Sequence, residues 1–374
     1  MKNHAKLAVM IGRWQPFHNG HWRNLKIALQ SSEHVLVLVC SSNLAQTIKN
    51  PFTSEQRKQM ILDTIASMTP EEVSEVGFTS HKEIMDSVTI VAANDYLYED
   101  NRWLSEIQST ISSVYLETFP EEDPGTYNRK NIAIVGHDKD ESTYYLRMFP
   151  RYSTIDTGAY SEIGEVPINA THVRKMIFEN HLTSIKSLVP SAVFDYILKA
   201  KKADQFYQLY EEYQHVADYK ALWAHTPYPV TFNTVDAVVV EAGHVLLIKR
   251  KFAPGKGLWA LPGGFINVSE TSENAVIREL KEETGLKVPE IVLKKAITYR
   301  KRFDHPDRSL RGRTITEAFL IELSGSGDGK LPRVKGSDDA EDARFFEISE
   351  VMNMSTQLFE DHFSIISMML SRSK

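Results

Sequence analysis

The feature that most constrains this chain is a pattern of glycines and carboxylates between residues 264 and 286. Gly264 is followed after five residues by Glu270, and seven further residues lead to the segment R-E-L-K-E-E-T-G-L at 278–286. Three carboxylates of that segment stand at i, i+3 and i+4, and a helix would place them on one face: Glu279, Glu282 and Glu283. They would repel one another without a cation, and hard oxygen ligands suit Mg²⁺ or Mn²⁺. The spacing therefore predicts a helix with a divalent metal site.

A solvated, charged helix is the ordinary reading of R-E-L-K-E-E alone. Seven fixed positions at roughly 1 in 15 each, over a few hundred start points, give a chance match on the order of one in a million. The pattern resembles the Nudix box, G-x5-E-x7-R-E-U-x-E-E-x-G-U, at every fixed position. The resemblance implies an α+β domain, an α/β/α sandwich with a mixed sheet, that hydrolyses a diphosphate. It also implies that Glu279, Glu282 and Glu283 bind the metal and that the last two are catalytic.

The rest of the second half extends this interpretation. Residues 235–240 and 245–248 predict a hairpin before the box. Beyond it, basic residues gather in a turn that is often only solvated: Arg302, Arg308, Arg311 and Arg313. The turn resembles the R-G-R-[VT] segment of Nudix enzymes that cleave ADP-ribose. The resemblance implies an ADP-ribose site made by Arg302, Arg311, Arg313 and Gly264. A later acidic loop offers candidates for a general base: Asp338, Asp339 and Glu341.

A second pattern opens the chain. The apolar run 7–11 leads into Gly12-Arg13-Trp14-Gln15-Pro16-Phe17-His18-Asn19-Gly20-His21, and a helical pattern with an apolar face follows. Such a strand, loop and helix point backbone N–H groups and a helix dipole at one spot, which suits phosphate. On their own, His18 and His21 could simply open a helix.

The loop resembles the H-x-G-H nucleotidylyltransferases, and most closely the G-R-[FWM]-Q-P-F-H-x-G-H of archaeal-type nicotinamide mononucleotide (NMN) adenylyltransferases. Residues 168–174 resemble the superfamily's second signature, I-S-[SG]-T-x-[IV]-R, with Asn169 and Ala170 replacing the usual residues. The family implies a Rossmann-like α/β domain with a parallel sheet and Mg²⁺ bridging the phosphates. It implies three catalytic residues, His18, His21 and Arg174. It further implies an ATP and NMN site made by Gly12, Arg13, Arg57, Trp103 and Thr171.

Local patterns support this fold and leave some roles open. The apolar run 35–40 is typical of a parallel strand covered on both faces. Thr53 and Gln56 fit a capping box at the start of the helix that contains Arg57. Trp103 recurs at helical spacing with apolar residues, as a core residue would, whereas the family stacks a Trp near this place on nicotinamide. The polar run 136–140 could bind phosphate or only make a turn.

Composition bounds the rest. A chain of 374 residues predicts two domains, which we expect at 1–190 and 227–374, joined by a helical connector over 191–226. The connector's apolar stripe closes the first domain or joins copies of the chain, so a homo-oligomer stays open. The net charge of −6 argues against a general nucleic-acid binder. A single cysteine and the absence of an apolar run near the ~20 residues of a membrane span predict a cytoplasmic protein without membrane contact.

Together the two resemblances imply an enzyme with two activities: NAD synthesis from ATP and NMN, and hydrolysis of ADP-ribose to AMP and ribose 5-phosphate. The partners would be the small nucleotides ATP, NMN, NAD and ADP-ribose. Two alternatives stay open. The second half could sense a nucleotide or cleave another dinucleotide, although an intact box argues against a sensor. The first half could use nicotinate mononucleotide, phosphopantetheine or another phosphorylated acceptor.

Overall fold

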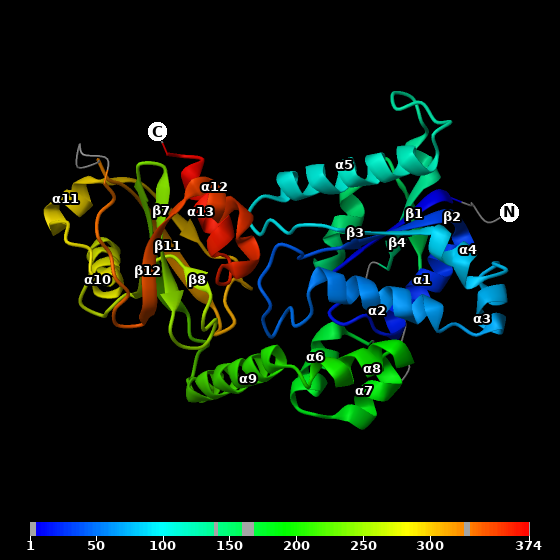
Figure 1. Ribbon diagram of the computed structural model, residues 1–374, viewed down its shortest axis with the longest axis horizontal. Helices are drawn as coiled ribbons and strands as arrows, with labels where there is room; N and C mark the ends of the chain where they lie inside the picture. Colours follow the sequence, from blue (N-terminus) through cyan, green and yellow to red (C-terminus); the bar gives the residue numbers. More distant parts are fainter. Residues whose placement is uncertain (1–4, 138–140, 159–167, 325–329, 374) are drawn as a thin grey trace. The chain divides into compact units, whose positions relative to one another are not determined.

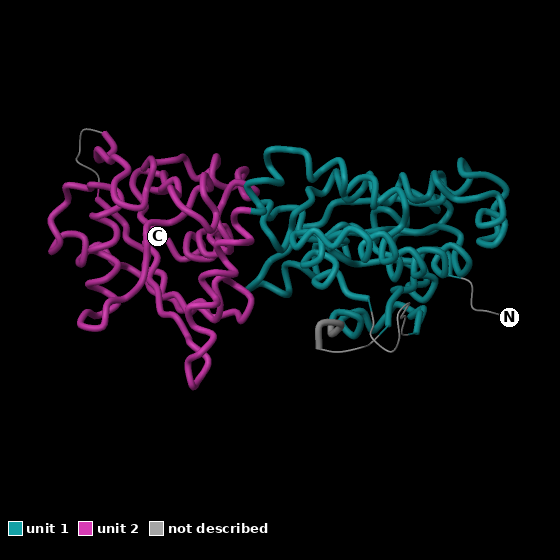
Figure 2. Tube along the Cα trace, turned by 90° about the horizontal axis from the view of Figure 1, so that it is seen from below, with its two compact units in different colours: residues 1–210 teal, residues 211–374 magenta. Residues whose placement is uncertain are grey.

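The computed structural model describes residues 5–137, 141–158, 168–324 and 330–373, of which 141–144 are described by their backbone alone. The chain divides into two compact units, Met1–Tyr210 and Glu211–Lys374 (Figure 2). The division falls inside helix α9 (Asp204–Leu222), earlier than the boundary that the sequence predicts near residue 226. Each unit has a sheet and a core of its own.

The first unit is built on a five-stranded parallel sheet. Its strands are β1 (Ala5–Gly12), β2 (Ser32–Val39), β3 (Val88–Ala92), β4 (Ile132–Gly136) and β5 (Ser153–Asp156). Their order is β3-β2-β1-β4-β5. Strands β2 and β3 are thus added on one side of β1 and strands β4 and β5 on the other, so the strand order reverses between β1 and β4. In open parallel sheets ligands bind outside the carboxyl ends of the strands at such a point. The segment after β1 is the loop Gly12–His21.

Helices cover both faces of this sheet. They are α1 (Asn19–Ser31), α2 (Ser54–Ala66), α3 (Pro70–Glu75), α4 (His81–Asp86), α5 (Asp100–Thr118), α6 (Ala170–Phe178), α7 (Leu182–Leu188), α8 (Ser191–Ala200) and the start of α9. The helix α5 lies on one face, where Ile107 and Ile111 pack against Leu7, Val9 and Leu36, while α1 and α2 lie on the other (Figure 1). The capping box at Thr53 is confirmed, because Thr53 and Gln56 exchange both hydrogen bonds. This doubly wound architecture confirms the predicted Rossmann-like class.

The second unit holds a seven-stranded mixed sheet. Its strands are β6 (Phe232–Glu241), β7 (His244–Arg250), β8 (Trp259–Ala260), β9 (Gly263–Phe265), β10 (Ile297–Phe303), β11 (Thr314–Glu322) and β12 (Ala340–Glu347). The main order is β10-β11-β6-β7-β12, with β8 paired to β7 and β9 to β6. Only β11 and β6 run parallel in that order. The hairpin predicted before the box is confirmed as β6 and β7.

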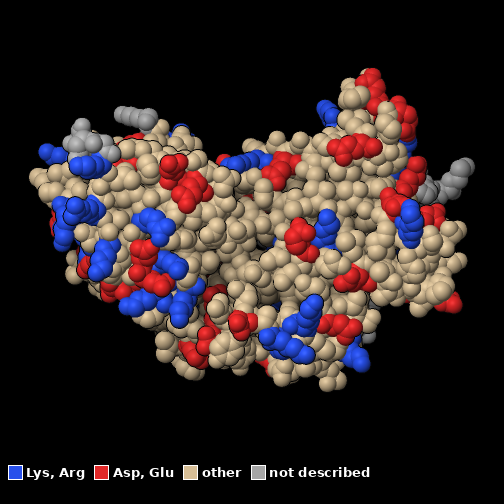
Figure 3. All heavy atoms as spheres, in the orientation of Figure 1, with Lys and Arg blue, Asp and Glu red and all other residues tan. Residues whose placement is uncertain are grey.

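Helices lie on both faces of the second sheet as well. They are α10 (Ser272–Thr284), α11 (Glu290–Lys295), α12 (Ile348–Asn353) and α13 (His362–Leu370). Val276 and Leu280 of α10 pack on Val235, Val239 and Leu246 with no exposed surface. The predicted sandwich with a mixed sheet is therefore confirmed. Basic and acidic side chains are interspersed over the described surface in Figure 3. In the part of the chain that is described, no helix is long and apolar enough to cross a membrane.

Candidate active sites

The loop after β1 is shaped by Gly12 and Trp14. The Trp14 indole folds back over Gly12, where a Cβ atom would lie 2.8 Å from the ring, so only glycine fits at this position. Trp14 adopts a positive φ of 52° and its Nε1 donates to the Leu38 carbonyl at 2.9 Å. A buried indole with its N–H satisfied fixes the loop on the second strand. Gly12 therefore lets the chain turn back at the carboxyl edge of the sheet.

The two histidines of the loop begin α1 together. The backbone N–H of His18, the N-cap residue, donates to Nδ1 of His21 at 3.2 Å, and the two imidazole rings stack with centroids 3.5 Å apart. Because Nδ1 of His21 accepts a hydrogen bond, the proton of its neutral ring lies on Nε2. The His-x-x-His spacing thus makes a capping pair and leaves His21 with a ring N–H donor at the N-terminus of a helix, which is a place that favours anions.

Two of the three predicted arginines are buried beside this loop. Arg57 is 1% exposed and donates to the carbonyl oxygens of Arg13 and Cys40, both at 2.6 Å, as well as to Thr53. Arg174 donates to the Gln15 carbonyl at 2.9 Å. Burial, and the nearby charge of Arg13, lower the pKa of Arg57 and of Arg174 to about 10. Arg57 and Arg174 thus each lie close enough to Arg13 for their positive charges to repel, an arrangement that would suit a bound anion.

The structure gives Arg57 a second role that the sequence does not indicate. Most of its N–H groups bind backbone carbonyls from three segments, the loop after β1, the loop after β2 and the start of α2. Its predicted phosphate contact stays a prediction. What is observed is that Arg57 ties together the three segments that surround the carboxyl edge.

The second signature starts α6 as predicted. Asn169, which replaces the usual Ser, is the N-cap residue, and its Oδ1 accepts from the His172 N–H at 2.8 Å. Thr171 is exposed and its Oγ1 accepts from Arg174 at 3.0 Å. The substitution by Asn therefore keeps the cap, since Asn is among the best N-cap residues.

Trp103 belongs to an aromatic cluster on α5. Its ring meets Tyr145 and Phe149 edge-on, with centroids 6.5 and 6.3 Å away, and it is half-buried. Trp103 thus packs against the core of the first unit, and its stacking on nicotinamide stays a prediction. In the polar run after β4, Nδ1 of His137 pairs with Asp156 at 2.9 Å, while residues 138–140 lie outside the described part.

One acidic group near this edge was missed by the sequence analysis. Asp95, beyond β3, accepts from the Ser41 hydroxyl and exchanges two hydrogen bonds of 2.9 Å between its backbone and the Asn43 side chain. Burial raises its pKa, and Arg13 and Arg57 oppose that rise. No spacing in the sequence links residues 41, 43 and 95, which come together only because β2 and β3 are neighbours.

In the second unit, the predicted carboxylates meet the glycine loop. A Cβ on Gly264 would lie 2.5 Å from Oε1 of Glu279, and the Gly263 N–H donates to Oε2 of Glu283 at 2.9 Å. Helix α10 begins at the N-cap Thr271 and ends at Gly285, whose φ of 60° needs glycine. The first end of the box thus lets backbone and carboxylates approach closely, and the second end lets the helix stop in a left-handed turn.

Arg278 lies among the box carboxylates. Its guanidinium binds Glu270 at 2.6 and 3.0 Å, and its Nη1 donates to Glu279 at 2.8 Å and to Glu282 at 2.9 Å. The hydrogen bonds from Arg278 lower the pKa of Glu270 to about 2. The helix face brings the carboxylates together as the spacing predicts.

The carboxylates fit a divalent cation. Burial raises the pKa of Glu283 to about 8, and it raises that of Glu279 as well. A raised pKa means that the ionised carboxylates lack enough positive charge nearby, which a bound cation would supply. Within the described ranges, no three acidic, His or Cys side chains are already grouped as ligands, and Arg278 takes up oxygen atoms of Glu279 and Glu282. Metal binding would therefore require these side chains to turn from Arg278.

The arginines of the predicted basic turn make different contacts in the structure. Arg311 is half-buried and its guanidinium lies 5.1 Å from the centroid of the Phe265 ring, beside the glycine loop. Arg313 donates to the Asp304 carbonyl. The side chain of Arg302 is 62% exposed and pairs with Asp304 at 3.2 Å. Contacts with the box region are thus seen for Arg311, whereas Arg302 and Arg313 bind their own turn.

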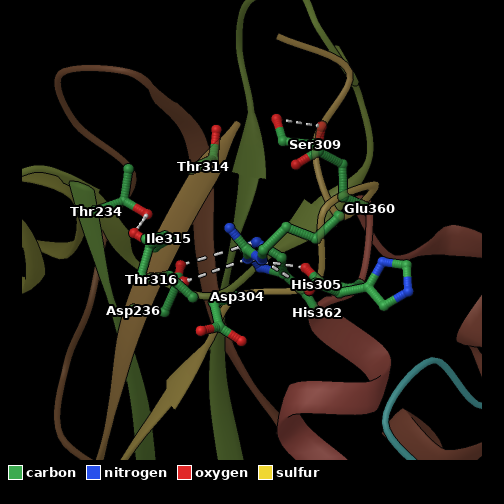
Figure 4. A network of polar contacts seen from close by, with 12 residues as sticks. Thr234, Asp236, Asp304, His305, Ser309, Thr314, Ile315, Thr316, Glu360 and His362 are labelled. Atoms are coloured by element: carbon green, nitrogen blue, oxygen red, sulfur yellow. Dashed lines mark hydrogen bonds and ion pairs between the residues drawn. The ribbon is translucent and has the colours of Figure 1, made fainter. Parts of the chain in front are cut away.

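Arg308, the fourth basic residue, is part of a buried network. It makes a bidentate ion pair with Asp361, in which Nε and Nη2 each donate to one carboxylate oxygen at 2.9 Å. Its Nη2 also lies 4.0 Å from Oδ2 of Asp236. Figure 4 shows Asp236 and Thr316 on neighbouring strands, together with Glu360 and with His362, the first residue of α13. Thr316 donates to Asp236 at 2.6 Å. No spacing in the sequence indicates this network, because its members are up to 126 residues apart (362 − 236).

Comparison with known proteins assigns each half of the chain to a family. Residues 9–149 match the family model described as Cytidylyltransferase-like, and 231–368 match the NUDIX domain. A bifunctional NMN adenylyltransferase/ADP ribose pyrophosphatase from Francisella tularensis is 35% identical, with a TM-score of 0.83 over 98% of this chain and 99% of that one. The chain belongs to this bifunctional family. A second structure of the Francisella tularensis protein, with AMP and a Mn ion, gives a TM-score of 0.84 at 34% identity.

Curated relatives also match each half of the chain separately. A nicotinamide/nicotinic acid mononucleotide adenylyltransferase of Acinetobacter baylyi is 28% identical over 206 residues, which cover 55% of this chain and 92% of that protein. An ADP-ribose pyrophosphatase of Methanocaldococcus jannaschii is 39% identical over 132 residues, which cover 35% of this chain and 69% of that protein. Each half thus has relatives of its own, in the order that the sequence predicts.

Arg250 is a further residue of the Nudix half that the sequence analysis missed. It lies at the end of β7, where Nε donates to the Pro254 carbonyl at 2.8 Å and the guanidinium lies 4.2 Å from the centroid of the Phe359 ring. Burial and the nearby Arg311 lower its pKa, while Glu360, Glu283 and Asp339 oppose this. Asp339, one of the predicted candidates for a general base, also raises the pKa of Glu283, so it lies near that box carboxylate.

Proposed function

We propose that the first unit transfers AMP from ATP to NMN, giving NAD and pyrophosphate. The observation that carries this is the convergence of Arg13, Arg57 and Arg174 with the His18–His21 pair at the carboxyl edge of the sheet. Residues of two signatures 150 residues apart (168 − 18), together with Arg57, are thereby gathered where nucleotides bind in such folds.

This reaction needs positioning and charge, not a covalent intermediate. A phosphate oxygen of NMN attacks the α-phosphorus of ATP, and the bond to the β-phosphate oxygen breaks to release pyrophosphate. His21, with its proton on Nε2, donates a hydrogen bond to the triphosphate, as do His18 and the helix N-terminus. Arg13 and Arg174 balance the charge that develops on the leaving pyrophosphate, with Mg²⁺ bound to the phosphates. Arg57 holds the surrounding loops and completes the anion receptor.

The second unit hydrolyses ADP-ribose to AMP and ribose 5-phosphate. Glu279, Glu282 and Glu283 would hold Mg²⁺, which when bound polarises the diphosphate and lowers the pKa of water. Glu283, anchored by the Gly263 N–H, lies near Arg250, and Arg250 and the nearby Arg311 would bind the diphosphate. The stacked pair of Arg311 and Phe265 offers a flat surface for the adenine or for a ribose.

The remaining proposals concern the setting of the protein. The catalytic domains span 1–190 and 227–374, with the helices between them as a connector. The protein acts in the cytoplasm on small nucleotides, without nucleic acid or membrane, and a homo-oligomer through the connector's apolar stripe stays open.

The test is to incubate the purified chain with each substrate set and Mg²⁺. NMN with ATP is expected to give NAD, and ADP-ribose to give AMP and ribose 5-phosphate, both followed by chromatography. Mn²⁺ in place of Mg²⁺ would show which ion the second unit prefers. Tight binding of ADP-ribose without AMP release would instead identify the second unit as a sensor, and NAD absent from the first mixture would point to another acceptor.

The choice of acceptor is expected to depend on Trp103. Replacing Trp103 by Ala removes the indole faces while Tyr145 and Phe149 remain, so the KM for NMN should rise about 10-fold, the loss typical of a cation stacked on an aromatic ring. The nicotinate mononucleotide reaction serves as the comparison, because that ring carries an additional carboxylate. Initial rates with each acceptor measure the effect. An unchanged KM for NMN would contradict the stacking role.

A further inference from the structure

The glycine loop that meets Glu283 is held at three points. The Leu261 N–H donates to Nδ1 of His362 at 2.8 Å, the Pro262 carbonyl accepts from the Ala237 N–H at 2.8 Å, and the Gly263 N–H donates to Glu283 at 2.9 Å. Two of these bonds go to the sheet and to the box helix. The third bond is accepted by His362, the first residue of α13, which lies about 100 residues further along the chain.

His362 is built to accept that bond. The residue is 6% exposed, Leu261 is 1% exposed, and the bond between them is buried. A neutral imidazole that accepts at Nδ1 carries its proton on Nε2, and Nε2 lies 3.8 Å from Oδ1 of Asp236. Burial lowers the pKa of His362 to about 3, which keeps the ring neutral and Nδ1 free of a proton. A protonated ring could not accept from Leu261.

The surroundings fix the ring in place. Asp361 is bound to Arg308 by two bonds, and the Phe359 N–H donates to the Trp259 carbonyl at 2.8 Å, so the segment 358–362 runs beside 259–261. Asp236 pairs with Gly263 in the sheet, where a Cβ on the glycine would lie 2.8 Å from Oδ1 of Asp236. The carboxylate, the imidazole and the glycine loop therefore leave one another little room to shift.

We propose that His362 is a positioning residue for the pyrophosphatase site: its Nδ1 holds the Leu261–Gly263 loop so that the Gly263 N–H stays on Glu283. This inference rests on the proposed hydrolysis of ADP-ribose. His362 makes no contact with substrate in this role; it acts through two backbone amides and so orients a carboxylate that is to bind the metal. Groups that orient metal ligands from behind typically change rate or affinity 10–100-fold when lost.

Two substitutions separate the hydrogen bond from packing. In His362→Asn the side-chain oxygen can take the place of Nδ1 and accept from Leu261, whereas in His362→Leu the apolar volume remains and the acceptor is lost. We expect the Leu variant to lose about 10-fold or more in kcat for AMP release, with the KM for ADP-ribose within about 3-fold. The Asn variant should stay within about 3-fold of wild type in both.

A second measurement does not depend on activity. Amide hydrogen exchange of the segment 259–265, in the full chain without metal, should be about 10-fold faster in the Leu variant and close to wild type in the Asn variant, because the Leu261 and Gly263 amides lose protection together. NAD formation from NMN and ATP, measured on the same preparations, shows that the chain is otherwise intact.

The outcomes separate the inference from the proposed function. Wild-type protein that releases no AMP contradicts the hydrolysis itself, whatever the variants do. If wild type is active, then a Leu variant with wild-type kcat, or with unchanged exchange in 259–265, overturns the positioning role. Should the Leu variant not fold, the Asn variant decides: wild-type exchange and rate support the role, and a 10-fold loss of either overturns it.

Discussion

Replacing Glu283 by Gln abolishes nearly all release of AMP from ADP-ribose, with an expected loss of about 100-fold or more in kcat. Gln keeps the volume of the side chain and can still accept from the Gly263 N–H, 2.9 Å from Oε2 in the wild type. It removes the negative charge that a divalent cation requires on this face of α10. The rate is measured at saturating ADP-ribose and Mg²⁺ by chromatography of AMP.

The matched control is Glu273→Gln on the same helix. Glu273 is exposed in the first turn of α10, away from the carboxylates at i, i+3 and i+4, so its loss should leave the rate within about 2-fold. Both substitutions change the net charge of the helix equally. Equal loss in the two variants, or none in Glu283→Gln, would contradict a metal-binding role for Glu283.

Loss of folding would not explain the effect, because the same substitution should stabilise the metal-free protein above neutral pH. Burial raises the pKa of Glu283 from 4.5 to about 8. A carboxyl group whose pKa rises on folding opposes folding as it ionises, so wild-type stability falls between about pH 4.5 and 8. The Gln variant lacks this fall. Calorimetry with chelator at pH 5 and pH 8 should therefore show its melting temperature rising relative to wild type as pH increases.

Sequence reasoning reached the parts of both sites that are local in the chain. The carboxylates of α10 lie on one face because helix geometry puts i, i+3 and i+4 together. Gly264 is needed because a Cβ would meet Glu279, and Gly285 because its φ is positive. The capping box at Thr53 likewise depends on residues three positions apart. Such features follow from backbone geometry alone.

What sequence reasoning could not reach depends on which strands become neighbours. Asp95 joins Ser41 only because β3 lies beside β2, and His362 reaches Leu261 only because α13 begins beside β8. Likewise, Arg57 binds backbone carbonyls in the loop after β1, in the loop after β2 and at the start of α2, which are far apart in the chain. A basic residue near a phosphate-binding motif predicts a phosphate contact, and the sequence does not show whether its side chain is exposed or buried. Arg57 is 1% exposed, and this burial could not be predicted from the sequence.

Replacing His21 by Asn is expected to lower NAD formation by about 100-fold or more while leaving the fold intact. The Asn side-chain oxygen can take the position of Nδ1 and accept from the His18 N–H, 3.2 Å away in the wild type, so the start of α1 keeps its cap. What the variant loses is Nε2 with its proton, the donor that we assign to the triphosphate. Removing one such preorganised donor typically costs about 2.7–4 kcal/mol in the barrier.

The control for this variant is His181→Asn, at the N-cap of α7, where the side chain is 59% exposed. It makes the same chemical change at a helix start outside the loop after β1, and its rate should stay within about 2-fold of wild type. AMP release from ADP-ribose, measured on the same protein, reports whether the second unit is intact. A His21→Asn variant that made NAD at the wild-type rate would show that this imidazole only caps α1, and the donor to the triphosphate would then have to be sought in Arg13, Arg174 and the backbone of the helix start.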